Sequence, residues 1–198
     1  MSPPPRLVLA STSRYRAELL ARLGLPFEST RPEVDESPRS GEAPAELVAR
    51  LAAAKARAGR GERRDALIIG SDQVAVIGDR ILGKPGSHER AAAQLRAASG
   101  RRVSFLTGLA LLDTRDDALC TEVVPFHVRF RALGDAEIEA YLEAERPYDA
   151  AGSFKSEGLG IALFEAMEGE DPTALVGLPL IRLCTLLRAA GLDPLLHR

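Results

Sequence analysis

The strongest signal for fold and chemistry in this sequence is the stretch Ile68-Ile69-Gly70-Ser71-Asp72-Gln73-Val74. It continues an apolar run that starts at Ala66, whose length and branching predict a buried strand. Gly70 follows this run at once, and an acid comes two residues later. Because ligands bind at the carboxyl ends of strands in open α/β sheets, we expect Asp72 at a sheet edge, within reach of a metal ion or a water.

A second polar segment, Gly83-Lys84-Pro85, follows this acid along the chain. The residues between the two, 76–82, predict a hairpin that turns at Gly78-Asp79. A hairpin returns the chain on itself, so Asp72 and Lys84 are expected to lie close together. A carboxylate and a lysine at a strand end suit a phosphate ester with a divalent metal. Taken alone, however, this stretch is more typical of a polar strand end without chemistry.

The composition is that of a soluble globular protein. Of the 198 residues, 45% are hydrophobic and 27% are charged, so we expect one domain over residues 1–198 with a proper core. The 26 basic and 28 acidic residues give a net charge of −2 and form no long block of one sign. This pattern argues against nucleic acid or a membrane as a partner and leaves a local phosphate pocket as the place for basic residues.

The two cysteines, Cys120 and Cys184, show no metal-ligand spacing, which favours a reduced, cytoplasmic protein. The first six residues lack the apolar core of a signal peptide. No apolar run approaches the roughly 20 residues that cross a bilayer. The expected location is therefore the cytoplasm.

The N-terminal segment predicts a strand at 6–10 and a helix at 14–23 that is capped by Ser13. Hydroxyl groups and free N–H groups at a helix N-terminus form a ready anion site. Arg14 and Arg16 in the first turn oppose the helix dipole. They either bind an anion or are simply solvated, and the residues alone leave both readings open.

A second strand is predicted at 27–30, followed by a loop over 31–44 and a helix over 44–58. The loop carries Glu33, Asp35 and Glu36, which are either solvated charges or part of the carboxylate set that Mg²⁺ needs. The predicted inner face of the helix comprises Leu47, Leu51 and Ala54. Lys55 lies one position beyond this face and on its own resembles a solvated or snorkelling lysine.

The second half of the chain alternates between helices and strands. The expected elements are a helix from Ser87 to Ser99, strands at 102–113 and 119–130 around a turn at 114–117, a helix from Asp135, a flexible glycine-rich polar loop at 150–161, a strand near 161–164, and a last helix that ends at Gly191. The last helix places Cys184 in the core. We assign no role to the three histidines.

Several separated motifs, in order, resemble the Maf family of nucleoside triphosphate pyrophosphatases over roughly residues 7–192. The matching segments are Leu9-Ala10-Ser11-Thr12-Ser13 with Arg16 and Glu18-Leu19-Leu20, Pro32-Glu33-Val34-Asp35-Glu36, Lys55, Gly70-Ser71-Asp72-Gln73, Gly83-Lys84-Pro85, Ala151-Gly152-Ser153-Phe154-Lys155-Ser156-Glu157-Gly158, and Leu175-Val176-Gly177-Leu178-Pro179-Leu180. This resemblance implies an α/β fold in which a long, curved mixed sheet is flanked by helices, with two lobes and a central cleft.

The resemblance also implies hydrolysis of a nucleoside triphosphate to the monophosphate and pyrophosphate. It makes Asp72 the general base or a metal-bound carboxylate, and it makes Glu36 the second acid that holds Mg²⁺ or Mn²⁺. The phosphate-binding residues that it implies are Ser11, Ser13, Arg16, Lys55, Lys84 and Lys155. A metal lowers the pKa of its bound water, so Asp72 need only orient that water.

Three residues bear on the choice of base. Gln73 and Glu157 resemble the branch of the family that hydrolyses 7-methyl-GTP, because the dTTP and UTP branch carries threonine and glutamine there. Tyr15 stands where the 7-methyl-GTP branch usually has tryptophan, and Ser13-Arg14-Tyr15-Arg16 departs from the usual Ser-Pro-Arg-Arg. The Glu157 carboxylate can accept both donors of the guanine edge, and the aromatic face of Tyr15 favours a cationic ring. In a regular strand, however, Asp72 and Gln73 point to opposite faces, so both line one site only if the strand ends or bulges.

Two other functions stay open at this point. One is a dTTP and UTP pyrophosphatase of the same family, which Gln73 and Glu157 disfavour. The other is a non-catalytic, nucleotide-sensing regulator of septum formation, which the retained acids and cations disfavour. A small-molecule nucleoside triphosphate is the expected partner, and the resemblance allows a homodimer.

Overall fold

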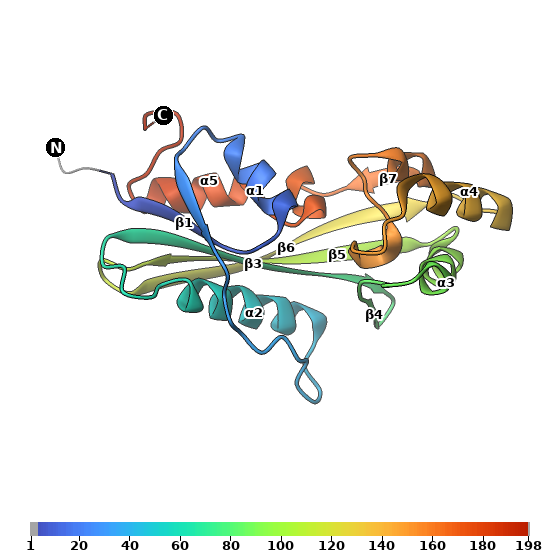
Figure 1. The fold of residues 1–198 in the computed structure, drawn as a ribbon, viewed down its shortest axis with the longest axis horizontal. Helices are drawn as coiled ribbons and strands as arrows, with labels where there is room; N and C mark the ends of the chain where they lie inside the picture. Colours follow the sequence, from blue (N-terminus) through green and yellow to red (C-terminus); the bar gives the residue numbers. More distant parts are fainter. Residues whose placement is uncertain (1–3, 198) are drawn as a thin grey trace.

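The computed structural model describes residues 4–197, which form one seven-stranded sheet with five α-helices around it (Figure 1). The strands are β1 (Arg6–Ala10), β2 (Phe27–Thr30), β3 (Ala66–Ile77), β4 (Arg80–Leu82), β5 (Arg102–Asp113), β6 (Ala118–Phe130) and β7 (Phe164–Glu168). The α-helices are α1 (Arg14–Ala21), α2 (Pro44–Ala58), α3 (His88–Ala98), α4 (Asp135–Glu145) and α5 (Leu180–Ala189). Three short 3-10 helices are η1 (Ala151–Ser153), η2 (Leu159–Leu163) and η3 (Pro172–Val176).

The sheet is mixed and runs in the order β2-β1-β3-β5-β6-β7, with β4 paired to β3. The β1 strand is parallel to both β2 and β3, and all other pairs are antiparallel. The long strands β3, β5 and β6 extend from one end of the molecule to the other (Figure 1). This architecture confirms the predicted α/β class with a long mixed sheet flanked by helices.

At the end of the sheet that contains β1, helices cover both faces (Figure 1). Leucines of α1 and α5, among them Leu19 and Leu183, pack against Leu67, Ile69 and Leu109 on one face. On the other face, small residues of α2 pack against the alternate strand positions in a cluster made of Val8, Ala10, Ala52, Ala56, Ala66, Ile68, Ala110 and Leu112. Alternation along β3 therefore sends odd-numbered residues toward α5 and even-numbered ones toward α2.

The opposite end of the sheet has its own core, built with α3, α4, η1 and η2. Its centre is aromatic: Phe154 stacks edge-to-face on Phe105, Phe130 and Phe164 at centroid distances of 5.2, 5.6 and 4.8 Å. Such pairs stabilise a core beyond their area burial. The two ends of the molecule are thus separate hydrophobic clusters joined by continuous strands.

Helix α2 lies unusually close to the sheet at two glycines. A Cβ atom on Gly70 would come within 2.1 Å of the Ala52 carbonyl oxygen, and one on Gly108 would come within 2.1 Å of the Val48 carbonyl oxygen. No side chain fits there, so both positions require glycine. This close approach sets the distance between α2 and the middle of β3.

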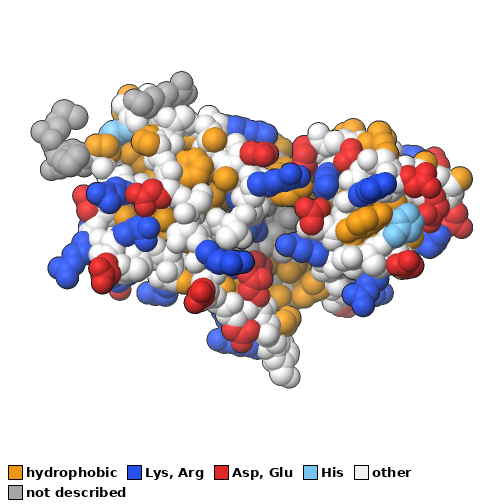
Figure 2. All heavy atoms as spheres, viewed as in Figure 1, with side chains coloured by type: hydrophobic (Ala, Val, Ile, Leu, Met, Phe, Trp, Pro, Cys, Tyr) orange, Lys and Arg blue, Asp and Glu red, His pale blue; other side chains and the backbone are white. Residues whose placement is uncertain are grey.

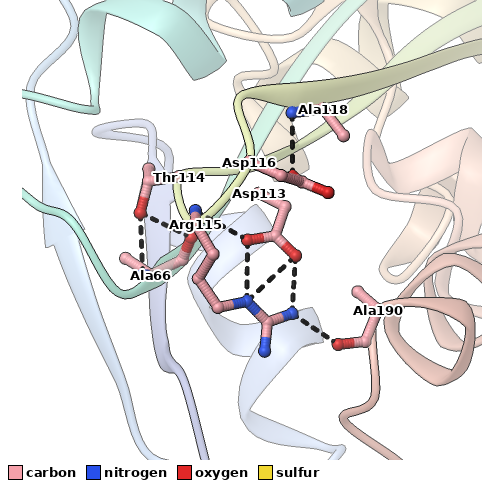
Figure 3. Close-up of polar contacts among 7 residues, drawn as sticks. All are labelled: Ala66, Asp113, Thr114, Arg115, Asp116, Ala118 and Ala190. Atoms are coloured by element: carbon pink, nitrogen blue, oxygen red, sulfur yellow. Dashed lines mark hydrogen bonds and ion pairs between the residues drawn. The ribbon is translucent and has the colours of Figure 1, made fainter.

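The predicted turn at 114–117 joins β5 to β6 and is tied to two other elements (Figure 3). The Thr114 hydroxyl accepts from the backbone N–H of Ala66 at 2.9 Å, at the start of β3. Arg115 pairs with Asp113 and donates to the carbonyl of Ala190 at 2.7 Å, just after α5. These bonds tie the turn to the N-terminal end of β3 and to the C-terminal end of α5.

The structure also corrects several expectations. β3 continues through Gly70 to Ile77 in regular register with β5, so the strand does not end before Asp72. Residues 159–163 form η2 in place of the expected strand, which begins at Phe164, and the loop over 150–161 holds two 3-10 helices. Cys184 is only half-buried, because Leu183 and Leu187 face the core instead.

Helix α1 ends at Ala21, two residues before its expected end. On α2, the inner face holds Val48, Ala52 and Lys55, whereas Ala54 is only half-buried. Among the helices of residues 4–197, none combines the length and apolar composition that a bilayer-spanning helix requires.

Candidate active site

One cleft of about 970 Å³ lies between the two ends of the molecule, and every residue to which the family resemblance assigns a role lines it, whereas Glu33 and Asp35 do not. The residues with an assigned role are Ser11, Ser13, Tyr15, Arg16, Glu36, Lys55, Asp72, Gln73, Lys84, Lys155 and Glu157. Figure 2 shows basic side chains gathered around the central hollow, with acidic side chains beside them. The structure therefore brings together residues that are widely separated in the sequence.

The cleft opens along one edge of β3. The ladder with β1 ends at Ile69, and the ladder with β4 begins at Ala75. Within residues 4–197, no strand pairs with this edge of β3 over 70–74. Asp72 therefore points toward α2 and Gln73 toward η3, yet both line the cleft. The condition that the strand must end or bulge was wrong, because a free edge exposes both faces.

The centre of the cleft is an ion-pair cluster of Lys55 with two carboxylates. The ammonium nitrogen of Lys55 lies 2.6 Å from Asp72 Oδ1 and 2.6 Å from Glu36 Oε1. The exposed fractions of the side chains are 7% for Lys55, 13% for Asp72 and 61% for Glu36. The hydrogen bond from Lys55 lowers the pKa of Glu36 below its ordinary value. Lys55 is thus neither solvated nor snorkelling, and it joins an acid of β3 to an acid of the loop 31–43.

The turn between β1 and α1 supplies the next group of polar contacts. Ser11 is buried, and its hydroxyl accepts from the backbone N–H of Ser13 at 3.1 Å and from Arg16 Nη1 at 3.4 Å. Ser13 caps α1 by accepting from the backbone N–H of Arg16. This arrangement is the helix N-terminus with hydroxyl groups that the sequence predicted, and it faces the cleft.

Arg16 is held in place by the residue that ends η3. Its Nε donates to the carbonyl of Gly177 at 2.8 Å. Desolvation lowers the pKa of the Arg16 guanidinium, while the charges of Asp72 and Glu36 act in the opposite direction. The guanidinium therefore lies close to both acids, but its observed hydrogen bonds go to neutral oxygens, which leaves it charged and available to an anion.

The side chain of Gln73 is fixed by three acceptors. Its Nε2 lies 2.9 Å from Thr107 Oγ1, 2.6 Å from the carbonyl of Ala174 and 3.3 Å from that of Leu175. These contacts use the amide NH₂ group and determine its orientation. A ligand in the cleft therefore meets the amide oxygen of Gln73, which is a hydrogen-bond acceptor.

Four further charged residues of the cleft come from the segment after β4 and from the loop around η1, and we call them the outer wall: Lys84, Asp149, Lys155 and Glu157. Lys84, Asp149 and Glu157 are exposed. Lys155 Nζ lies 3.6 Å from Asp149, and the Glu157 carboxylate accepts from its neighbour Ser156 at 3.2 Å. The inner wall is Ser11, Ser13, Arg16, Lys55, Asp72 and Gln73.

Tyr15 stands at the mouth of the cleft with a cation already on its ring. The Arg14 guanidinium carbon lies 4.7 Å from the ring centroid, and Arg14 Nη2 donates to the Tyr15 hydroxyl at 2.9 Å. One aromatic face is therefore occupied by an arginine, which the sequence interpretation did not anticipate. A cationic base stacks favourably only on the other face or after Arg14 moves.

Some contacts that support the cleft were not predicted from the sequence. The buried Ser71 hydroxyl lies 2.9 Å from the same Gly177 carbonyl that binds Arg16. Gly177 has a φ of 105°, a conformation that glycine adopts readily. Thr107 belongs to a long apolar strand, and the sequence did not predict that it would orient Gln73. The family motif at residues 175–180 contains Gly177 but did not predict these contacts.

The two acids fit a divalent cation. The Asp72 and Glu36 oxygens bound to Lys55 are at most about 5.2 Å apart, twice the distance of each from the ammonium nitrogen. Mg²⁺ is commonly held by one or two carboxylates plus waters and substrate phosphates. Within the described residues, no three His, Cys, Asp or Glu side chains converge as a metal site, so phosphate oxygens would have to complete the coordination.

Comparison with known proteins assigns this α/β fold and its cleft to a family. The model of the Maf-like protein family matches residues 6–190, so the chain belongs to the Maf family. The 7-methyl-GTP pyrophosphatase of Nitrosococcus oceani is 61% identical over 188 residues, which cover 95% of this chain and 94% of that protein. The 7-methyl-GTP pyrophosphatases of Pseudomonas aeruginosa and Burkholderia pseudomallei are each 58% identical, with 96% and 95% of this chain and 98% and 89% of their own lengths covered.

Proposed function

We propose that this chain hydrolyses 7-methyl-GTP to 7-methyl-GMP and pyrophosphate. The observation that carries the proposal is the cleft, in which all residues that the family resemblance implied face one space. The similarity to 7-methyl-GTP pyrophosphatases over almost the whole chain supports the choice of substrate.

The proposed reaction requires a water aimed at the α-phosphorus and cations around the leaving pyrophosphate. Asp72 orients this water through its carboxylate, from a rigid position in the middle of a paired strand. Arg16 donates to the phosphates from the inner wall, and Lys84 and Lys155 do so from the outer wall. The Ser11 hydroxyl accepts two hydrogen bonds in the structure, so its own proton is free to bind a phosphate oxygen.

We further propose that the reaction uses Mg²⁺ or Mn²⁺, held by Asp72 and Glu36. When bound there, such an ion would lower the pKa of a coordinated water and neutralise phosphate charge. The cations of the chain bind and orient the polyphosphate but do not themselves activate a water. Turnover should therefore stop in excess chelator and return when Mg²⁺ or Mn²⁺ is restored.

The base is assigned to the outer wall and to Gln73. The exposed Glu157 carboxylate can accept the two adjacent N–H donors on the guanine edge. The Gln73 oxygen adds a fixed acceptor on the inner wall. Acidic groups near the base also favour the positive charge that N7-methylation gives to guanine.

A pyrophosphate-release panel tests the proposal. The protein is offered 7-methyl-GTP, GTP, UTP and dTTP with Mg²⁺, and kcat/KM is compared. We expect the highest value for 7-methyl-GTP. A higher value for UTP or dTTP would assign the chain to the other branch of the family, and nucleotide binding without any pyrophosphate release would make it a sensor.

We propose that the protein acts in the cytoplasm on this small-molecule nucleotide. Both cysteines are free, which suits a reducing compartment. The homodimer that the family resemblance allows stays a prediction.

A further inference from the structure

Lys55 differs from the other lysines of the cleft in what it contacts. Its ammonium group lies 2.6 Å from each of the two acids proposed to hold the metal, and the side chain is only 7% exposed. Lys155 instead pairs with an exposed acid of the outer wall, and Lys84 is itself exposed. Lys55 therefore occupies a position between two carboxylates that suits either an ammonium group or a divalent metal ion.

The charges around this pair are already compensated. Lys55, Arg16 and Lys84 all act on the Glu36 carboxylate, and Arg16 is also attracted by Asp72. Two negative charges thus face three positive ones. A free divalent cation that approached this cluster would meet a site with no excess of negative charge.

The position of Lys55 is set by the backbone. Gly70 and Gly108 allow α2 to contact the sheet closely, and Lys55 lies one turn after Ala52, whose carbonyl meets Gly70. Glu36, by contrast, stands on an exposed loop, and the ammonium group ends a flexible four-carbon chain. The ammonium can therefore turn toward another anion without any change in α2.

We propose that Lys55 is an internal counter-cation that closes the Asp72–Glu36 pair to free divalent metal until a triphosphate draws the ammonium away. The several negative charges of a triphosphate attract Lys55 and restore an excess of negative charge at the pair. Metal is then admitted together with the nucleotide and not before it. The inference rests on the metal-dependent reaction proposed above, and it assigns to Lys55 a gating role beyond phosphate binding.

The test measures Mn²⁺ binding to the protein alone, by the loss of the electron paramagnetic resonance signal of free Mn²⁺. Lys55→Gln removes the counter-cation, and we expect it to bind Mn²⁺ at least about ten-fold more tightly than wild type. Lys155→Gln is the matched control, because it removes the same charge from the same cleft without touching either acid. Its affinity should differ from wild type by less than about three-fold.

Equal Mn²⁺ affinity in folded Lys55→Gln and wild type would overturn the proposal. Should Lys55→Gln fail to fold, the wild-type measurement still decides, since micromolar Mn²⁺ binding without nucleotide contradicts a closed pair. Pyrophosphate release is recorded separately. Because Mn²⁺ binding needs no turnover, a failure of the proposed hydrolysis would leave the binding result readable on its own.

Discussion

The inner and outer walls of the cleft are built in different ways. On the inner wall, Ser11, Arg16, Lys55 and Gln73 each make hydrogen bonds or ion pairs to other elements or to the neighbouring turn. On the outer wall, Lys84 and Glu157 are exposed, and the nearest ion pair, Lys155 to Asp149, is a long 3.6 Å contact. Apart from the ammonium group of Lys55, the inner wall is therefore preorganised, whereas the outer wall leaves its charged groups free to adapt to a ligand.

This difference matches the two tasks of a nucleotide hydrolase. Orientation of a water and of developing charge requires groups fixed before the substrate arrives. Recognition of a base can use side chains that become ordered only when the ligand binds, although this ordering costs conformational entropy. The following predictions are ordered by expected effect, and each tests a property of one or both walls.

The largest effect is expected from Gly70→Ala. The new methyl group would lie 2.1 Å from the Ala52 carbonyl oxygen and 2.6 Å from the Ala56 nitrogen, so α2 must move away from β3. We expect a loss of about 3 kcal/mol or more in the free energy of unfolding, measured by urea denaturation. Gly83→Ala, beside Lys84, is the matched control, because nothing lies within 4 Å of its new methyl group. Equal losses in the two variants would contradict the contrast in packing.

Asp72→Asn should abolish turnover without unfolding the protein. Asparagine keeps the shape of aspartate but loses the charge that orients water and metal, so kcat should fall on the order of 10²-fold or more. The carboxylate of the outer wall offers the comparison: Asp149→Asn removes an exposed partner of Lys155 and should change kcat by no more than a few-fold. Near-normal turnover by a folded Asp72→Asn protein would remove this residue from the mechanism.

Glu157→Gln tests the outer wall as the site of base selection. The amide presents an N–H toward one guanine N–H and removes a charge that attracts the methylated ring. A charge-assisted hydrogen bond is worth roughly 1.5–3 kcal/mol, so the kcat/KM ratio of 7-methyl-GTP to UTP should fall about 10- to 100-fold. An unchanged ratio would show that Glu157 does not read the base.

The smallest effect is expected in the pH dependence of the free energy of unfolding, through Tyr141, which holds the backbone of the outer-wall residue Lys155. The buried Tyr141 hydroxyl accepts from the backbone N–H of Lys155 at 3.1 Å, and burial raises the pKa of Tyr141. A raised pKa means that the unfolded chain loses this proton first, above about pH 10, whereas the folded protein keeps it. The free energy of unfolding should therefore fall above that pH by up to about 1.4 kcal/mol per pH unit.

The measurement is urea unfolding near about pH 9 and about pH 11, in wild type and in Tyr141→Phe. The variant should lose less stability across this interval, because the titrating phenol is gone. Tyr148→Phe should behave as wild type, since it keeps Tyr141. Identical pH dependence in wild type and Tyr141→Phe would show that this phenol is not the group responsible.

Much of the fold could be predicted because its elements follow local patterns. The helix at Pro44–Ala58 and the long strand at Arg102–Asp113 occupy the ranges that their periodicity and turn residues indicated. Gly70 misled the interpretation, because glycine within an apolar run is typical of a strand end. Here it serves an approach of α2, a contact that no local pattern contains.

The site residues were gathered through the family resemblance, but their contacts were not predictable from sequence. Lys55 lies beyond the apolar stripe that the sequence predicted for its helix, and its burial is made favourable by the opposing acids of β3 and of the loop over 31–43. The cover of Arg14 over Tyr15 and the anchoring of Gln73 by Thr107 also depend on neighbours in space. Periodicity reports which face a residue occupies and not what lies opposite.

The parallel pairing of β1 with β3 predicts that the site forms late in folding. The β5–β6 ladder closes through a short turn. A much longer stretch of chain, which includes β2, the loop over 31–43 and all of α2, separates Ala10 of β1 from Ala66 of β3. Closing that longer stretch of chain costs more entropy, and non-local parallel pairs form slowly. Ser11 and Arg16 reach Asp72 only after β1 has docked. A nascent or refolding chain with its hairpin already formed should therefore hydrolyse nothing until its N-terminal strand is in place.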